Sequence, residues 1–151
     1  MNNLSFHITD ITANSIRANA SEIGLSVEEQ DTRIVIRITD NGSGMDAETA
    51  RRVTNPFYTT RTTRKVGLGL PFLIQNAEQT GGSVTLTSEP GKGTEVRAVF
   101  HSDHIDCPPW GDLPGTVALL ITGNPEINVC FEYRSGETGY SISTNEIKEI
   151  L

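Results

Sequence analysis

Residues 33–45 read Arg-Ile-Val-Ile-Arg-Ile-Thr-Asp-Asn-Gly-Ser-Gly-Met, and this stretch decides our prediction of the fold. The part from Arg33 to Thr39 alternates apolar and polar side chains, which is typical of a half-buried strand. The following residues, Asp40–Gly44, favour turns, so the strand is expected to end in a loop. The stretch Gly24–Glu28 alternates in the same way, and it predicts a neighbouring strand joined through an acidic turn at residues 28–31.

The segments on either side of this strand pair predict helices and a second strand pair. Small or apolar residues recur every three or four positions from Leu4 to about Glu22, which indicates a helix. After the loop we expect a short helix capped by Asp46 and ending near Val53, a longer helix over 68–80, and strands over 83–88 and 94–100. These elements predict an α/β fold of the sandwich type, in which a mixed sheet carries helices on one face.

Residues 101–151 differ from residues 1–100 in proline content and charge, and they predict a small α+β extension. Three prolines mark 101–114 as a connector, and the rest predicts a helix over 114–122, a hairpin over 127–143 and a last short helix capped by Thr144. The extension holds two basic and eight acidic residues, against ten and eleven in residues 1–100. We therefore divide the chain at residue 100 and interpret the acidic extension as a candidate docking element for a partner.

Composition and charge exclude several classes of protein. The net charge of −7 argues against nonspecific binding to nucleic acid, which needs basic groups to neutralise phosphates. The longest apolar run, Val117–Ile121, is far shorter than the roughly 20 residues of a membrane helix, and no signal peptide is readable. Two cysteines without a targeting signal suggest reduced thiols, so we expect a cytoplasmic protein.

The first helix carries a possible site for a metal–phosphate group. His7, Asp10, Asn14 and Arg17 are spaced at steps of three, four and three residues, so that a helix places them along one stripe. Asn14 can ligate Mg²⁺, Arg17 can pair with phosphate oxygens, and Asp10 can orient or deprotonate a nucleophile. Taken alone, such a stripe is more often the solvated polar face of an ordinary helix.

Three further motifs follow in the chain. The glycines of Asp40–Met45 let the backbone approach a flat ligand, and the Asp40 carboxylate can accept a hydrogen bond from the exocyclic amine of adenine. Gly67-Leu68-Gly69-Leu70 opens a helix, where free N–H groups favour a phosphate, and three cations precede it: Arg61, Arg64 and Lys65. The last motif, Gly91–Thr94, lies between two strands. Each alone is also compatible with a plain turn or surface loop.

In this order and at these spacings, the four motifs resemble the ATP-binding domain of the GHKL superfamily. That superfamily includes gyrase, mismatch-repair ATPases, histidine kinases and the anti-sigma-factor serine kinases, and the resemblance covers about residues 1–100. It implies the Bergerat fold, an α/β sandwich that holds ATP between its helices and a lid. By this resemblance, Asn14 ligates Mg²⁺ and Arg17 contacts phosphate, while Asp40 binds adenine. The remaining implied ligand contacts are the base-lining Gly42, Gly44 and Met45, the lid aromatic Phe57, the phosphate-loop Gly67 and Gly69 with their neighbours Leu68 and Leu70, the basic Arg61, Arg64 and Lys65, and Thr94 beside the adenine.

The whole chain is also similar to small stand-alone histidine-kinase-like proteins encoded beside iron hydrogenase subunits. This likeness rests on residues 61–71 and on His104-Ile105-Asp106 with the prolines and glycine that follow. It implies a hydrogenase or redox-enzyme subunit as a candidate partner, and a homodimer is another possible assembly. No helix pair bearing a phosphoacceptor histidine precedes Leu4, so we do not expect a complete histidine kinase.

Three hypotheses of function follow from these observations. In the first, the protein is a kinase that transfers the γ-phosphate of ATP to a partner protein, with Asp10 as the general base. In the second, it is a non-catalytic module whose docking depends on bound nucleotide. In the third, it is a histidine kinase ATPase subunit that acts on a separate phosphoacceptor.

Two remaining features are expected to be structural. His101, His104 and Cys107 have a spacing that could suit a metal, but zinc sites usually show four spaced ligands, so we expect a surface connector. Cys130, between Val129 and Phe131 in a predicted strand, is expected to be a small buried residue.

Overall fold

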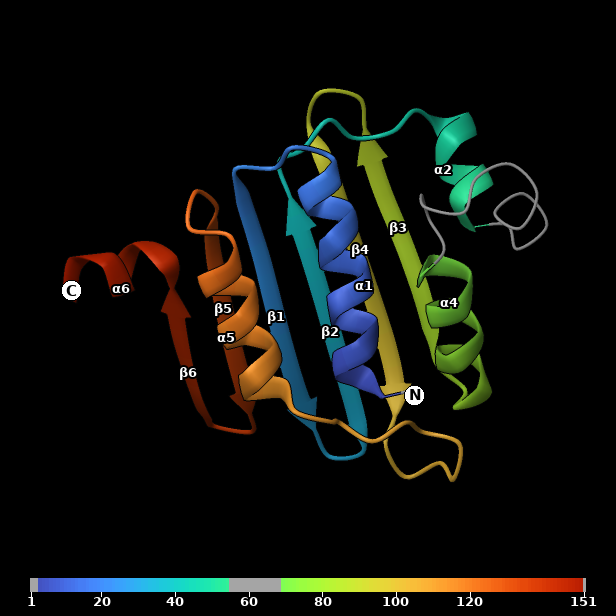
Figure 1. The fold of residues 1–151 in the computed structure, drawn as a ribbon. Helices are drawn as coiled ribbons and strands as arrows, with labels where there is room; N and C mark the ends of the chain where they lie inside the picture. Colours follow the sequence, from blue (N-terminus) through green and yellow to red (C-terminus); the bar gives the residue numbers. More distant parts are fainter. Residues whose placement is uncertain (1–2, 55–68, 151) are drawn as a thin grey trace.

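The computed structural model describes residues 3–54 and 69–150, and within these residues six strands form one sheet (Figure 1). The strands are β1 (Glu22–Gln30), β2 (Arg33–Asp40), β3 (Ser83–Glu89), β4 (Gly93–His101), β5 (Asn128–Ser135) and β6 (Thr138–Ser143). The helices are α1 (Leu4–Arg17), α2 (Ala47–Thr54), α4 (Gly69–Gln79), α5 (Leu113–Gly123) and α6 (Thr144–Ile150). The strand order is β3-β4-β2-β1-β5-β6, and every neighbouring pair is antiparallel except β1 and β5. The predicted mixed sheet with helices is confirmed.

The core lies between the sheet and the helices α1, α4 and α5, which cover one of its faces (Figure 1). The alternation that predicted β2 is visible in its burial, because Ile34, Ile36 and Ile38 point into the core and are at most 4% exposed. From the opposite side, α1 contributes apolar side chains one helical turn apart, such as Leu4 and Ile8. Removing this apolar surface from water is the main force that holds α1 on the sheet.

The first helix ends at Arg17, so the predicted end near Glu22 is wrong. Asn19 has a φ of 63°, a left-handed conformation that stops the helix, and the Ala18 N–H closes its end by donating to the Asn14 carbonyl. The N–H groups of Ser21 and Glu22 donate instead to the Asn41 side chain at 2.9 and 3.0 Å. These residues therefore begin β1 rather than continue α1.

Other element boundaries differ from the prediction for local reasons. Strand β1 continues to Gln30, so the turn before β2 is shorter than the predicted 28–31 and is made with Asp31 at a φ of 55°. The cap of α6 is Ser143, whose Oγ accepts from the Glu146 N–H at 3.2 Å, and not Thr144. The Thr144 side chain is buried and accepts from the Val129 N–H at 3.0 Å. The predicted Asp46 cap of α2 is confirmed by a 2.8 Å bond from the Thr49 N–H.

The extension joins the same sheet as the rest of the chain, because β5 runs parallel to β1 along eight residue pairs. The connector that leads to it contacts the start of α1. The Pro109 and Trp110 carbonyls accept from the N–H groups of Leu4 and Ser5, at 2.8 and 3.0 Å. Such N–H groups have no partner inside their own helix, so the connector completes the hydrogen bonding of its first turn.

Cys130 lies on the exposed face of β5, so the expectation that it is buried is wrong. Its neighbours Val129 and Phe131 point into the core, and alternation along a strand therefore turns Cys130 outward. No helix in the described parts of the chain is long and apolar enough to cross a membrane.

A buried histidine lies between α1 and α4. His7 is 2% exposed, packs near the rings of Phe72 and Phe100, and accepts a hydrogen bond at Nε2 from Asn76 Nδ2 at 2.8 Å. Burial lowers the pKa of His7 to about 4, because the charged imidazolium would lose its hydration. The side chain is therefore neutral in the folded protein at neutral pH and is closed off from any ligand.

We predict that His7 makes the protein sensitive to acid. The unfolded chain binds a proton at His7 near pH 6.5, whereas the folded protein does so only near pH 4. Stability is therefore full above pH 6.5 and falls by about 3 kcal/mol as the pH drops to about 4. Urea unfolding across this range, compared between the wild type and His7→Gln, measures the effect. An equally steep loss of stability in His7→Gln would assign the acid sensitivity to other groups.

Candidate functional site

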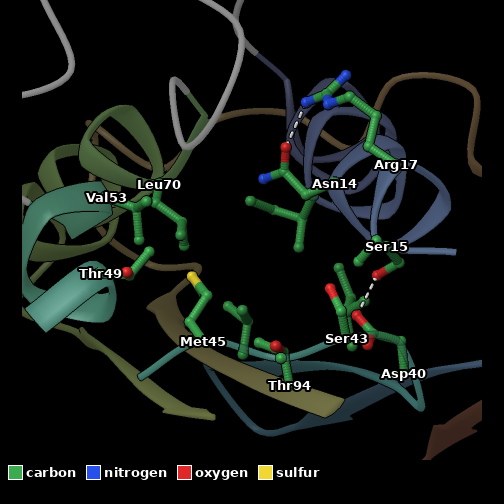
Figure 2. A pocket seen from close by; sticks show the side chains of 15 residues that line it. Asn14, Ser15, Arg17, Asp40, Ser43, Met45, Thr49, Val53, Leu70 and Thr94 are labelled. Atoms are coloured by element: carbon green, nitrogen blue, oxygen red, sulfur yellow. Dashed lines mark hydrogen bonds between the residues drawn. The ribbon is translucent and has the colours of Figure 1, made fainter. Parts of the chain in front are cut away.

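A cavity of about 250 Å³ opens between the C-terminal half of α1 and the ends of the central strands. Figure 2 shows Asn14 and Arg17 on α1 above this cavity, with Asp40 and Thr94 from the sheet below it. Most of the other lining side chains are apolar, among them Met45 and Leu70. A mainly apolar cavity with a few polar groups at its ends is typical of a small-molecule site.

Asp40 is held at the sheet side of the cavity by two hydrogen bonds. Its Oδ2 accepts from Ser15 Oγ at 2.6 Å, and its Oδ1 accepts from the Gly42 N–H at 2.8 Å. Ser15 is 3% exposed, so water does not compete with Asp40 for its hydroxyl group. The carboxylate is therefore fixed in orientation, and each oxygen keeps acceptor capacity for a further donor.

The loop that follows Asp40 is packed against the turn between β3 and β4. The Met45 N–H donates to Ser88 Oγ at 2.9 Å, and Ser88 Oγ in turn lies 2.8 Å from Thr94 Oγ1. Gly44 has a φ of +71°, and a Cβ atom there would lie 1.9 Å from the Glu89 carbonyl oxygen. The Gly91–Thr94 turn thus positions the predicted base-lining residues.

Asn14 and Arg17 interact with each other on α1, where Arg17 Nη2 donates to Asn14 Oδ1. Both side chains line the cavity. The helical spacing that predicted one stripe is therefore confirmed for this pair. In such a pair, the carboxamide oxygen can bind a cation and the guanidinium beside it can bind an anionic oxygen.

Asp10 lies one turn earlier on α1, against the first residue of α4. A Cβ atom on Gly69 would lie 2.9 Å from Asp10 Cβ and 3.3 Å from Asp10 Oδ2, so only glycine allows this approach. Partial burial raises the pKa of the Asp10 carboxyl, and the charge of Arg17 opposes the rise. A carboxylate with a raised pKa beside a helix N-terminus has the properties of a proton acceptor.

The structure brings seven of the predicted site residues to the cavity wall: Asn14, Arg17, Asp40, Gly44, Met45, Leu70 and Thr94. Three others lie behind it. Gly42 packs on Ala18, and Gly69 packs on Asp10, so these residues shape the site without lining it. The other predicted positions, Phe57, Arg61, Arg64, Lys65, Gly67 and Leu68, lie outside the described residues.

Several residues of the wall were not predicted from the sequence, including Ser15, Ser43, Thr49 and Val53. Ser15 is the important omission, because it bonds Asp40 across 25 residues of sequence. Its position directly after Asn14 was the available signal. A hydroxyl at that step of α1 faces the sheet between Ile11 and Ala18, which both line the cavity.

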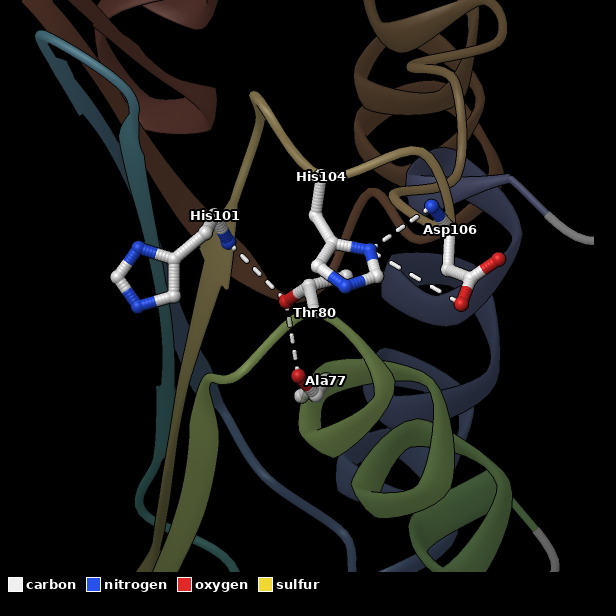
Figure 3. A network of polar contacts seen from close by, with 5 residues as sticks. All are labelled: Ala77, Thr80, His101, His104 and Asp106. Atoms are coloured by element: carbon white, nitrogen blue, oxygen red, sulfur yellow. Dashed lines mark hydrogen bonds and ion pairs between the residues drawn. The ribbon is translucent and has the colours of Figure 1, made fainter.

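Among the described residues, no three His, Cys, Asp or Glu side chains are grouped so that they could hold a metal ion. Figure 3 shows the rings of His101 and His104 pointing in different directions. The His104 Nδ1 atom accepts from the Asp106 N–H at 3.0 Å, and the His101 N–H donates to Thr80 Oγ1 at 3.1 Å. His101 is the last residue of β4, and His104 lies in the connector that follows it.

The sequence matches one protein family over residues 3–104, described as histidine kinase-, DNA gyrase B- and HSP90-like ATPase. This match covers more than half of the chain, so the protein belongs to this family of ATP-binding domains. The match includes all the residues that line the cavity, from Ile11 on α1 to Val96 on β4.

Curated relatives of the matched region include histidine kinases. Sensor histidine kinase YxdK of Bacillus subtilis is 29% identical over 104 residues, which are 64% of this chain and 32% of that protein. Sporulation kinase C of the same organism is 30% identical over 101 residues, which are 66% of this chain and 23% of that protein. The matched segments thus span less than a third of these relatives.

Solved structures share the fold at low sequence identity. The Aquifex aeolicus MutL ATPase domain complexed with ADP aligns with a TM-score of 0.53 at 18% identity, over 99% of this chain and 67% of that one. The N-terminal domain of a DNA repair protein aligns with a TM-score of 0.59 at 18% identity, over 95% and 52%. The architecture is therefore that of the Bergerat-type ATPases, as the sequence predicted.

The first prediction for this site concerns Asp40. Asp40→Asn keeps the size of the side chain but replaces one acceptor oxygen with a donor, so it is expected to abolish the preference for ATP over GTP. The affinity for ATP should fall by about tenfold to a hundredfold, the effect of losing a hydrogen bond to a charged group. Calorimetric titration with both nucleotides measures this, and unchanged selectivity would show that Asp40 does not read the base.

The second prediction concerns Ser15. Ser15→Ala removes one of the two donors that orient Asp40, and it should weaken ATP binding about fivefold, or about 1 kcal/mol. Ser43→Ala is a matched control, since Ser43 also lines the cavity while its hydroxyl makes no hydrogen bond to the described residues. The same titration applies. Equal losses in both variants would mean that Ser15 contributes only volume.

Proposed function

We propose that this protein binds Mg–ATP and transfers its γ-phosphate to a partner protein. The observation that carries the proposal is the continuity of the site. Asp40, held by Ser15, forms the base-reading end of the cavity, and Asn14 and Arg17 on the helix of Ser15 form the phosphate end. Asp10 lies behind the wall, one turn earlier on the same helix. Membership of an ATP-binding family supports the nucleotide, and the histidine kinase relatives support phosphoryl transfer.

In this proposal the adenine binds first to the sheet side of the cavity. Its exocyclic amine donates to Asp40, and its faces contact Met45 and the other apolar wall residues. The phosphates then extend along α1 towards the N-terminus of α4, where the N–H groups of a helix's first turn and the helix dipole favour negative charge. Arg61, Arg64, Lys65 and the loop glycine Gly67 are proposed to add positive charge and backbone donors there, with Phe57 in the lid.

The Mg²⁺ ion is proposed to bind through Asn14 Oδ1. The donor set fits this ion, because carboxamide and phosphate oxygens are ligands that Mg²⁺ accepts, and no cluster of three His, Cys, Asp or Glu side chains among the described residues offers an all-protein cage instead. Bound there, the ion neutralises charge on the phosphate oxygens. Arg17, which now donates to Asn14, can turn to a phosphate oxygen when Asn14 binds the metal.

Asp10 is proposed as the general base. It accepts the proton of the attacking group as that group bonds to the γ-phosphorus, and the bond from phosphorus to the leaving ADP oxygen breaks. Because the pKa of Asp10 is raised, acidification should abolish activity at a higher pH than it would for an enzyme whose base is an ordinary aspartate. Below that pH the carboxyl is protonated and cannot accept a proton.

The acceptor is proposed to be a hydroxyl of a partner protein, as for the anti-sigma serine kinases that this chain resembles. The similarity to proteins encoded beside hydrogenase subunits makes a redox-enzyme subunit the first partner to test, and the acidic extension the first docking element. A histidine on a separate subunit is the second candidate acceptor, because one of the curated relatives is a sensor histidine kinase.

Labelled ATP tests the proposal. The protein is incubated with Mg²⁺, γ-labelled ATP and candidate partners, and label on a partner is expected to fall 10²–10⁴-fold in Asp10→Asn. ATP affinity should stay nearly unchanged, and Asp40→Asn serves as the contrasting variant that loses binding. Acid treatment then separates a stable hydroxyl phosphate from a labile histidine phosphate.

Two results would contradict the proposal in different ways. Label transfer that survives Asp10→Asn would remove Asp10 as the base. ATP that binds but stays intact with every partner would leave the non-catalytic module, whose docking depends on nucleotide, as the function.

A further inference from the structure

The sheet has two edges, and the edge formed by β6 is the unprotected one. On the opposite side, α2 and α4 contact the edge strand β3 (Figure 1). The main contacts of strand β6 are with β5 and with the short α6, which leaves the sheet sideways beyond Ser143. All six residues of β6 are exposed or half-buried. One row of backbone N–H and C=O groups along β6 therefore has no strand partner among the described residues.

The sequence of β6 lacks the features that usually block such an edge. Thr-Gly-Tyr-Ser-Ile-Ser contains no charged residue and no proline, which are the common means of preventing a further strand from pairing. Two large apolar side chains are exposed instead: Tyr140 at 58% and Ile142 at 37%. They are two residues apart and so lie on the same face of the sheet.

The Tyr140 ring is already positioned by its neighbours. It packs edge-on to Phe131 with the ring centres 5.9 Å apart, and it lies 5.6 Å from the ring of Tyr133 on β5. These contacts restrict the ring before any partner arrives, so less side-chain entropy is lost on binding. An apolar side chain on an added strand would be covered by this aromatic surface.

The opposite face of the same edge carries unpaired negative charge. Beside β6 this face has a depression whose wall includes Glu132, Ser141 and Glu146 as well as Arg37, which pairs with Glu95 at 3.2 Å. The two basic residues of the extension are both engaged: Arg134 pairs with Glu132 at 2.9 Å, and Lys148 Nζ donates to the Pro125 carbonyl at 2.7 Å. Glu146 and Glu137, at the two ends of β6, make no ion pair with described residues.

We propose that the β6 edge binds an extended segment of a partner protein in which apolar and basic side chains alternate. The backbone of this segment would pair with β6 as a seventh strand, its apolar side chains would cover Tyr140 and Ile142, and its basic side chains would face Glu146. The inference rests on the part of the proposed function that assigns partner docking to the extension, and it adds the surface and the chemistry of the partner.

Charge distinguishes this occupant from a second copy of the chain. If two copies paired their β6 strands antiparallel, Glu137 of one would approach the start of α6 in the other, where Glu146 lies. Both groups are negative, and the whole extension is strongly acidic. A self-paired edge would therefore bring like charges together, whereas a basic segment neutralises them.

A peptide titration tests the proposal. The probe is a short synthetic peptide that alternates lysine and valine, with a glutamate–valine peptide as the charge control. Fluorescence anisotropy should show binding of the lysine peptide alone, weakening as salt is added. Ser141→Lys places a charge on the edge and should weaken binding about tenfold. Thr87→Lys on β3 is the matched control, since each substitution puts a lysine directly across from a glutamate, and it should leave binding unchanged.

Amide hydrogen exchange locates the peptide, and protection is expected in β6. Equal weakening by both substitutions, protection in β3 instead of β6, or a dimer that Ser141→Lys dissociates would overturn the proposal, the last in favour of a second copy. ATP titration of Ser141→Lys is run in parallel. Unchanged ATP affinity separates failure of this inference from failure of the proposed nucleotide function.

Discussion

The site depends on the contact between the end of α1 and the loop that follows β2. Gly42 lies so close to Ala18 that a Cβ atom would be 2.8 Å from the Ala18 carbonyl oxygen. Asn41 binds the backbone of Ser21 and Glu22 just beyond, and Ser15 bonds Asp40 just before. Because α1 carries the phosphate-side residues and the loop carries the base-side residue, this contact sets the distance between the two halves of the site.

Strong local patterns allowed most of the fold to be predicted from the sequence. The alternation in β2 and the turn chemistry at Asp40–Gly44 both come from short-range rules, and the sheet contains them as expected. The end of α1 was misplaced because its termination depends on a left-handed Asn19 and on Asn41, which is distant in sequence. Likewise Thr144 looked like a cap, but a tertiary bond to Val129 occupies its hydroxyl.

The candidate site was predictable where its residues lie at fixed spacings within one element. Asn14 and Arg17 are three residues apart on a helix, and the structure places them together. Ser15 was not predictable in that way, because its role appears only when β2 is placed beside α1. The environment of Asp10 also required the tertiary structure, since its burial comes partly from the approach of Gly69 on another helix.

The parallel pairing of β1 and β5 has a consequence for how the chain folds. Strands β1 and β2 are joined by a tight turn and can pair early, but the other side of β1 must wait for residues more than a hundred positions later in the chain. Contacts of such long sequence separation form slowly, because closing a large loop costs entropy before any contact compensates for it. During synthesis, β1 therefore presents an open edge until the extension has left the ribosome. When β5 pairs with β1, the C-terminal third of the chain covers this edge. The pairing thereby removes an open strand edge at which the chain could aggregate.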